Sequence, residues 1–154
     1  ALIHKQLYSM DNFACIHVEN YIRELLNMLL IHYESNKKID FEIDCQSIDL
    51  NMNLMLPLGL IINELAVNSL KHAFLNQREG KLFVGVRENK NREIELIFRD
   101  NGSGLPEGFN IEKADTFGFQ IIKNLLKQIK GSLEIKNEGG LFVKMIFFQG
   151  INKI

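Results

Sequence analysis

The chain has 154 residues, a formal net charge of -1 at pH 7 and a hydrophobic fraction of 46%. This length fits one domain with a substantial core, and the near-zero charge excludes the overall basic field typical of nucleic-acid-binding proteins. Cys15 and Cys45 match no metal-ligand spacing and no disulfide framework, so we expect a reducing, cytoplasmic setting. No stretch reaches the length of an uninterrupted transmembrane helix, so we expect no direct membrane contact by this chain.

The beginning of the chain, "ALIHKQLYSMDNF", lacks an initiator Met, a charged n-region and a signal-peptide cleavage site. We therefore interpret the chain as a piece of a longer protein. No internal repeat, low-complexity tract or Pro/Ser-rich linker divides it, so we expect a single folded domain.

The first half of the chain predicts two helices around one strand. Residues 17–35 place apolar side chains at helical spacing, and residues 38–45 alternate apolar and charged side chains as a half-buried strand does. A polar loop at 46–53 precedes a strongly apolar helix. We predict this helix from Pro57 to Phe74, because proline is tolerated in a first turn.

The second half predicts two hairpins separated by a loop and a helix. Two alternating runs within residues 81–100 form the first hairpin, and residues 101–116 form a long loop rich in turn residues. Residues 117–130 return to helical period and end at Gly131, after which residues 132–148 form the second hairpin. We expect an α+β fold, a two-layer sandwich in which helices cover one face of a mixed sheet.

Polar residues interrupt the apolar helix at regular spacing. Glu64, Asn68, Lys71 and His72 stand at i, i+4, i+7 and i+8, which places them on one face. A carboxylate and an amide oxygen suit Mg²⁺, and an ammonium group one turn further suits the phosphates that such a metal bridges. The spacing alone is equally compatible with a solvated stripe held by a Glu64–Asn68 hydrogen bond, so it leaves both interpretations open.

Two downstream stretches offer other parts of a ligand site. Asp100 ends a predicted strand, and Gly102 and Gly104 permit positive φ and close approach of a ligand to the backbone. Thr116 can cap the next helix, whose first turn holds Gly118 and offers free N–H groups to an anion. Taken alone, each stretch also fits a plain turn or a plain N-cap. The sequence contains neither a P-loop nor a strand–GxGxxG–helix unit.

In this order the three stretches resemble the Bergerat-fold ATPases, the superfamily of gyrase, the Hsp90 chaperones, MutL and the histidine kinases. The run "LPLGLIINELAVNSLKHAF" is most similar to the ATP-binding domain of sensor histidine kinases in the HisKA_2/HWE-related group. The run "ALIHKQLYSMDNFACIHVENYIRELLNMLL" is similar to the segment that leaves the dimerisation helices there. The resemblance implies that residues 1–17 are a remnant of that linker and that residues 18–150 are the ATP-binding catalytic domain.

The resemblance also implies a role for each polar residue. Asn68 would bind Mg²⁺ through its side-chain oxygen, Lys71 would reach the phosphates of ATP, and His72 would lie near the phosphates or the ribose. Glu64 holds the position of a carboxylate that activates water in the ATPase relatives, and in a kinase it would support the metal or the acceptor. Asp100 would accept a hydrogen bond from the adenine 6-amino group.

Further contacts are implied around the base and the lid. Gly102 and Gly104 would let adenine lie against the backbone, and residues 108–116 would form a short ATP lid, with Phe117 and Gly118 at its helix-side end. The sequence "TFGF" lacks the multiple-glycine run of many histidine kinases, so less backbone is available to wrap the phosphates.

Two other departures concern the adenine site and the phosphoacceptor. Leu141 stands where relatives often place a Thr that supports the adenine site. His4, His17 and His32 have no H-x-x-K-N-type context, so we expect the acceptor histidine to lie outside this chain. The isolated chain should therefore bind ATP without phosphorylating itself.

The implied function is transfer of the γ-phosphoryl group of ATP to a histidine on an adjoining dimerisation and phosphoacceptor domain, with a response regulator downstream and no nucleic-acid partner. One alternative is another Bergerat ATPase or a serine kinase of the anti-sigma-factor type, which would use the same pocket. The other alternative is a binding module without catalysis, in which the pocket has lost its affinity for nucleotides. We expect the isolated domain to be a monomer.

Overall fold

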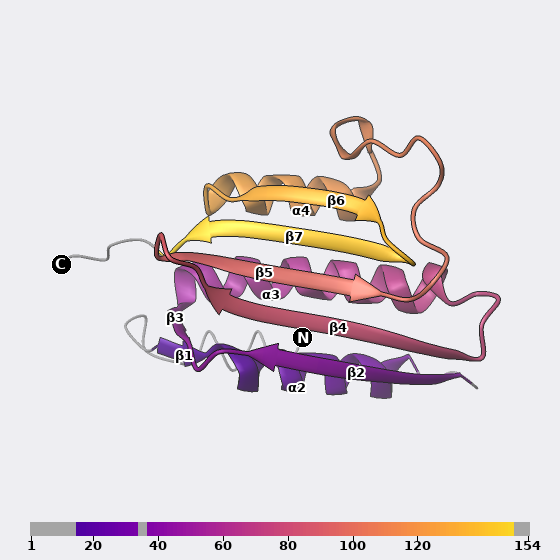
Figure 1. Ribbon diagram of the computed structural model, residues 1–154, viewed down its shortest axis with the longest axis horizontal. Coiled ribbons are helices and arrows are strands. Elements are labelled where there is room, and N and C mark those ends of the chain that lie inside the picture. Colours follow the sequence, from indigo (N-terminus) through magenta and orange to yellow (C-terminus); the bar gives the residue numbers. More distant parts are fainter. Residues whose placement is uncertain (1–14, 34–36, 150–154) are drawn as a thin grey trace.

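The computed structural model describes residues 15–33 and 37–149. A five-stranded mixed sheet forms one layer, and the helices form a second layer behind it (Figure 1). In chain order the elements are β1 (Cys15–His17), α2 (Val18–His32), β2 (Lys38–Cys45), β3 (Asp49–Asn51), α3 (Met52–Asn68), the π-helical turn η1 (Ser69–Ala73), β4 (Glu79–Glu88), β5 (Glu93–Asp100), the 3-10 turn η2 (Ile111–Lys113), α4 (Phe117–Gln128), β6 (Ser132–Asn137) and β7 (Leu141–Phe148). The predicted α+β two-layer sandwich is confirmed.

The strands of the main sheet follow the order β2-β4-β5-β7-β6. Both predicted hairpins are present, because β4 pairs antiparallel with β5 and β6 pairs antiparallel with β7. β2 lies parallel to β4, since the chain crosses behind the sheet through α3 between these two strands. A short β1–β3 ladder forms a separate two-stranded sheet beside the first turn of α3.

Alternation along the strands separates a covered face from a bare face. On β4 and β5 every second side chain is buried against the helices, and these residues lie opposite each other in register on the covered face. Examples are Val84, Val86, Leu96 and Phe98, all of which are at most 1% exposed. The intervening side chains point to the bare face, so the sheet is a one-sided layer of the kind that alternating patterns predict.

α3 begins five residues earlier than predicted. The Asn51 side chain accepts a hydrogen bond from the Leu54 amide and caps the helix at Met52. Pro57 therefore lies inside the helix, beyond its first turn, and its ring is buried in the core. The predicted loop at 46–53 therefore contains the β3 strand and the first two residues of α3.

The continuous helical segment Met52–Ala73 is also long and apolar enough to cross a membrane by length and composition alone. The expectation that no stretch reaches this length is therefore wrong. Half of the apolar part of this helical segment is buried inside the fold. Its composition follows from its position between the sheet and the neighbouring helices α2 and α4.

Candidate nucleotide-binding site

A pocket of about 460 Å³ lies between the C-terminal half of α3 with η1, the loop after β5, and the start of α4. The structure brings most of the sequence-predicted residues together in its lining: Glu64, Asn68, Lys71, His72, Asp100, Gly104, Thr116 and Gly118. Gly102 and Phe117 are not part of the lining. Three separate stretches of the sequence thus form one cavity.

The polar stripe of the α3–η1 helix, formed by Glu64, Asn68, Lys71 and His72, faces this cavity. Glu64 and Asn68 are half-buried, whereas Lys71 and His72 are exposed. No hydrogen bond joins Glu64 to Asn68 in the part of the chain that the structure describes. The cleft-lining interpretation is therefore favoured over a solvated stripe for the first two residues, and the two cationic side chains stand at the mouth.

The helix changes its winding immediately after Asn68. Residues Ser69–Ala73 form a π-helical turn, a feature that often marks functional sites. The wider turn places Ser69 inside the protein at 2% exposure, with its Oγ 2.7 Å from Asp100 Oδ2 and 3.1 Å from the Leu65 carbonyl oxygen. One hydroxyl hydrogen serves one acceptor at a time, and the shorter bond to the carboxylate is the stronger of the two.

Asp100 is the only charged residue among the described ones that is buried, at 6% exposure. Its Oδ1 accepts hydrogen bonds from the Gly102 and Leu141 amides, each at 3.0 Å, and its Oδ2 accepts the Ser69 hydroxyl. Three neutral donors therefore fix the carboxylate in one orientation toward the pocket. Oδ2 keeps one acceptor position for a ligand.

Ser69 was missed by the sequence analysis. The sequence does show a small polar residue directly after Asn68 in an apolar helix. On a regular helical wheel, however, Ser69 lies away from the stripe of Glu64, Asn68, Lys71 and His72. Leu141, which was predicted to lack a supporting hydroxyl, contributes its backbone amide to Asp100 instead. The hydroxyl comes from Ser69, on the opposite wall of the pocket.

The two glycines after Asp100 differ from each other. Gly104 has φ +75°, as the turn requires, but Gly102 does not have a positive φ. A Cβ atom at Gly102 would lie 2.5 Å from the Ala73 carbonyl oxygen, so this glycine allows the loop to approach the end of η1. The contact of Gly102 with adenine stays a prediction. Asn137 holds the next part of the loop through bonds to both backbone groups of Leu105.

The start of α4 closes the other end of the pocket. A Cβ atom at Gly118 would lie 2.9 Å from Glu64 Oε2, so the first turn of α4 touches the polar stripe of α3. Thr116 occupies the N-cap position, as predicted, but its side chain makes no capping hydrogen bond. Phe117 is 81% exposed and does not line the cavity, whereas Phe119 lines the pocket and contacts Phe109 of the loop.

The donor set of the stripe fits Mg²⁺. Asn68 offers an amide oxygen and Glu64 a carboxylate, both of which suit a hard cation. No group of three or more His, Cys, Asp or Glu residues that could hold a metal occurs among the described residues. The protein would therefore supply one or two ligands, and phosphate oxygens and water the rest, which is the usual environment of Mg²⁺ in nucleotide sites.

The one-sided sheet, the buried Asp100 and the stripe beside the first turn of α4 together define a nucleotide-binding domain of the Bergerat type. The family described as "Histidine kinase-, DNA gyrase B-, and HSP90-like ATPase" matches residues 53–149, which is more than half of the chain. The chain belongs to this family of ATP-binding domains, and the resemblance inferred from its motifs is confirmed.

Individual relatives agree with this assignment. The sensor histidine kinase PdtaS of Mycobacterium tuberculosis is 35% identical over 80 residues, which cover 51% of this chain and 16% of that protein. The anti-sigma F factor of Shouchella clausii is 26% identical over 63% of this chain and 73% of its own length. The structure of the blue-light-activated histidine kinase EL346 of Erythrobacter litoralis superposes with a TM-score of 0.81 at 19% identity, covering 90% of this chain and 43% of that one. The chain thus spans about a sixth of the length of PdtaS.

Proposed function

We propose that this domain binds MgATP and positions the γ-phosphoryl group for transfer to a histidine of an adjoining domain in a longer sensor kinase. The observation that carries the proposal is the buried Asp100 carboxylate, fixed by three hydrogen bonds at one end of a pocket whose other end holds Asn68 and Glu64. The proposal is supported by family membership and by the likeness to PdtaS.

Asp100 selects the base. The adenine 6-amino group donates a hydrogen bond to the free position on Oδ2, while the Ser69 hydroxyl and the two amides hold the carboxylate still. Guanine carries a carbonyl oxygen at this position, so two acceptors would face each other in a buried site, at a cost of about 1–3 kcal/mol or more. We therefore expect a strong preference for adenine nucleotides.

The stripe of α3 serves the phosphates. Asn68 would hold Mg²⁺ through its side-chain oxygen, and the metal would supply charge neutralisation at the phosphates. Lys71 at the pocket mouth adds a positive charge near the outer phosphates, and His72 lies beside it. Glu64 lies close to the first turn of α4 and would support the metal or the incoming acceptor. Phosphoryl transfer requires mainly positioning and charge neutralisation, which these groups supply.

The phosphoacceptor separates this proposal from its alternative. The likeness to an anti-sigma F factor supports a serine kinase that would use the same pocket. The test is to incubate the full-length protein with ATP labelled at the γ-phosphate and then treat it with acid or alkali. Phosphohistidine is labile to acid and stable to alkali, so label that is lost in acid supports the histidine kinase. Label that survives acid and is lost in alkali contradicts it and supports the serine kinase.

A further inference from the structure

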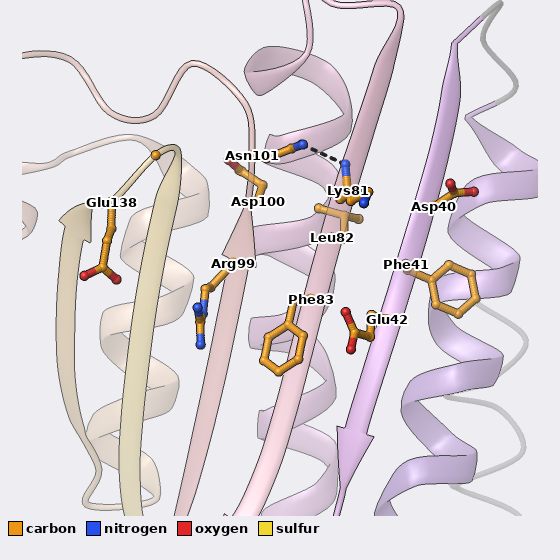
Figure 2. Close-up of a pocket in the computed structure, with 11 residues that line it drawn as sticks. Asp40, Phe41, Glu42, Lys81, Leu82, Phe83, Arg99, Asp100, Asn101 and Glu138 are labelled. Atoms are coloured by element: carbon orange, nitrogen blue, oxygen red, sulfur yellow. Dashed lines mark hydrogen bonds between the residues drawn. The ribbon is translucent and has the colours of Figure 1, made fainter.

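A hollow of about 590 Å³ opens on the bare face of the sheet, where β4 begins and β5 ends (Figure 2). Its volume falls within the range of small-molecule sites. It shares only Asp100 with the lining of the nucleotide pocket, which opens on the helix side of the sheet. Its lining holds charged side chains of both signs around one aromatic ring: Asp40, Glu42, Lys81, Phe83, Arg99 and Glu138.

The Phe83 ring forms the floor of this hollow. Side chains two residues apart on one face of a strand ordinarily stand about 7 Å from each other. A Cβ atom at Gly85, however, would lie 3.0 Å from the Phe83 ring. The ring therefore leans along β4 over Gly85, and the space above the strand stays open. A glycine inside a strand often marks such a close approach.

Arg99 is fixed on one side of the floor. It lies in register between Phe83 of β4 and Phe142 of β7. Its guanidinium carbon lies 5.1 Å from the centre of the Phe83 ring and 5.5 Å from that of Phe142. These cation–π contacts hold the planar guanidinium group in place, and its N–H groups remain available for a carboxylate.

Glu42 stands on the other side of the floor. It lies in register with Phe83 across β2 and β4, so the ring separates the Glu42 carboxylate from the Arg99 guanidinium (Figure 2). Two strand spacings, about 10 Å, lie between β2 and β5. Within residues 15–33 and 37–149, neither Glu42 nor Arg99 forms an ion pair. An unpaired anion and an unpaired cation therefore face each other across an apolar floor.

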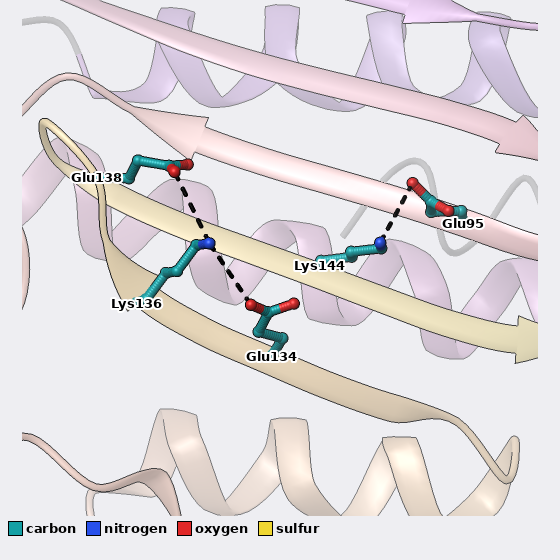
Figure 3. Close-up of polar contacts among 5 residues, drawn as sticks. All are labelled: Glu95, Glu134, Lys136, Glu138 and Lys144. Carbon is teal, nitrogen blue, oxygen red and sulfur yellow. Dashed lines mark ion pairs between the residues drawn. The ribbon is translucent and has the colours of Figure 1, made fainter.

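The other charges around the hollow balance each other. Asp40 and Lys81 lie opposite each other in the β2–β4 register and add one charge of each sign. Glu138 pairs with Lys136 at 3.7 Å, and Lys136 also pairs with Glu134 at 3.6 Å (Figure 3). A ligand with a net charge would be repelled by one side of the hollow, whereas a zwitterion matches both sides.

We propose that this hollow binds a small zwitterion of the amino-acid class, with its carboxylate on Arg99, its ammonium group on Glu42 and its apolar part on the Phe83 ring. Each charge-assisted contact spans about 2.8 Å between heavy atoms. Of the distance of about 10 Å between β2 and β5, about 4 Å then remains for the ligand. This is close to the separation of the ammonium nitrogen and the carboxylate oxygens in an α-amino acid. The hollow lies on the other face of the sheet from the nucleotide pocket, so the proposal does not depend on the proposed function.

Titrations of this chain followed by the NMR signals of its backbone amides test the proposal with three probes. L-phenylalanine carries both charged groups, phenylpropionate lacks the ammonium group, and phenethylamine lacks the carboxylate. We expect L-phenylalanine to bind with a dissociation constant on the order of 1 mM, as suits a small ligand in an open site. The amides of Lys81, Phe83 and Asn101 should shift, and those of the nucleotide pocket should not. Each of the other two probes should bind about three- to fivefold more weakly, because each loses one exposed charged contact.

Two variants assign the two ends of the ligand. Arg99→Gln should weaken the binding of L-phenylalanine and phenylpropionate about three- to fivefold and leave phenethylamine unchanged. Glu42→Gln should weaken the binding of L-phenylalanine and phenethylamine by a similar factor and leave phenylpropionate unchanged. A misfolded variant would lose all three probes alike. Lys127→Gln, on the exposed face of α4, serves as the control and should leave all three affinities unchanged.

Three results would overturn the proposal. The first is a wild type whose amide signals show no saturable shift with L-phenylalanine up to about 20 mM. The second is a set of shifts that lie away from the hollow. The third is a pair of variants that act equally on all three probes, because the charged groups of the ligand would then not contact Arg99 and Glu42.

Discussion

The two ends of the nucleotide pocket differ in how firmly their side chains are held. At the proposed adenine end, Asp100 is buried and receives three hydrogen bonds from Ser69, Gly102 and Leu141. At the proposed phosphate end, the Asn68 side chain has no hydrogen bond to another described residue, and Lys71 is exposed. The first end is organised before ATP arrives, whereas the second end depends on the metal and the phosphates for its final arrangement.

This difference predicts which substitutions act on the base and which act on the phosphates. Changes at the adenine end should weaken binding with or without Mg²⁺. Changes at the phosphate end should weaken nucleotide binding only when Mg²⁺ or the outer phosphates are present.

Replacement of Asp100 by Asn should lower ATP affinity about 100-fold, by loss of about 3 kcal/mol. The new amide group would present a donor to the adenine amino group or to the Gly102 and Leu141 amides, so at least one buried donor would be unpaired. Isothermal titration calorimetry measures the effect, with the exposed Asp49→Asn as the matched control. Equal affinities for the two variants would mean that Asp100 does not bind the base.

Replacement of Asn68 by Ala should weaken ATP binding about 10- to 50-fold in the presence of Mg²⁺, because the metal loses its protein ligand. In EDTA the variant and the wild type should bind ATP equally. The comparison requires only paired titrations in the two buffers, with Asn124→Ala on the exposed face of α4 as control. A loss of the same size in EDTA would contradict a role in metal binding.

Replacement of Ser69 by Ala should weaken ATP binding about tenfold, because Asp100 Oδ2 loses its fixed donor and the carboxylate can rotate. The preference for ATP over GTP should fall with it, a change that a purely structural defect would not produce. Adding Leu141→Thr to this variant returns a hydroxyl to the other wall of the pocket and should recover part of the affinity. If base preference is unchanged in Ser69→Ala, then Ser69 does not orient Asp100.

Replacement of Lys71 by Ala should have the smallest effect, about three- to fivefold on ATP and less on ADP, because an exposed charge is screened by water and salt. The difference between the two nucleotides should shrink as salt is added. Titrations at two ionic strengths measure this, and the exposed Lys127→Ala supplies the control. An effect that is equal for ATP and ADP at both salt concentrations would place Lys71 away from the outer phosphates.

Lys71 also has a neighbour that the sequence did not indicate. Its ammonium lies 5.7 Å from the centre of the Tyr33 ring, at the end of α2. A contact of this length at an exposed site contributes at most about 0.5–1 kcal/mol. The apo position of Lys71 is therefore weakly held, in agreement with an adaptable phosphate end.

The fold could be predicted from the sequence because each element carries a clear period. Helical spacing in residues 17–35 and strict alternation in residues 38–45 and 81–100 correspond to α2, β2 and the β4–β5 hairpin. The predicted start of α3 is five residues too late, because the prediction assigns Pro57 to the first turn of the helix. The deeper start follows from the Asn51 cap, a local side-chain hydrogen bond that periodicity does not show.

The site could be predicted in part. The residues and spacing of three motifs predict Asp100 and the polar stripe of α3 as parts of one site, and the fold brings them into one pocket. Ser69 could not be found because its position depends on the π-helical turn, which shifts side chains relative to a regular wheel. The close contact of Gly102 with Ala73 likewise depends on the tertiary structure, since the sequence shows only that a glycine is present.

The measurement that tests the account most directly is a set of ATP titrations of the wild type, Asp100→Asn and Asn68→Ala, each performed with Mg²⁺ and with EDTA. We predict that Asp100→Asn loses affinity by a similar factor in both buffers, whereas Asn68→Ala loses affinity only with Mg²⁺. This result would establish one end of the pocket as a metal-independent base site and the other as a metal-dependent phosphate site. Losses that are independent of Mg²⁺ for both variants, or absent for both, would contradict the account.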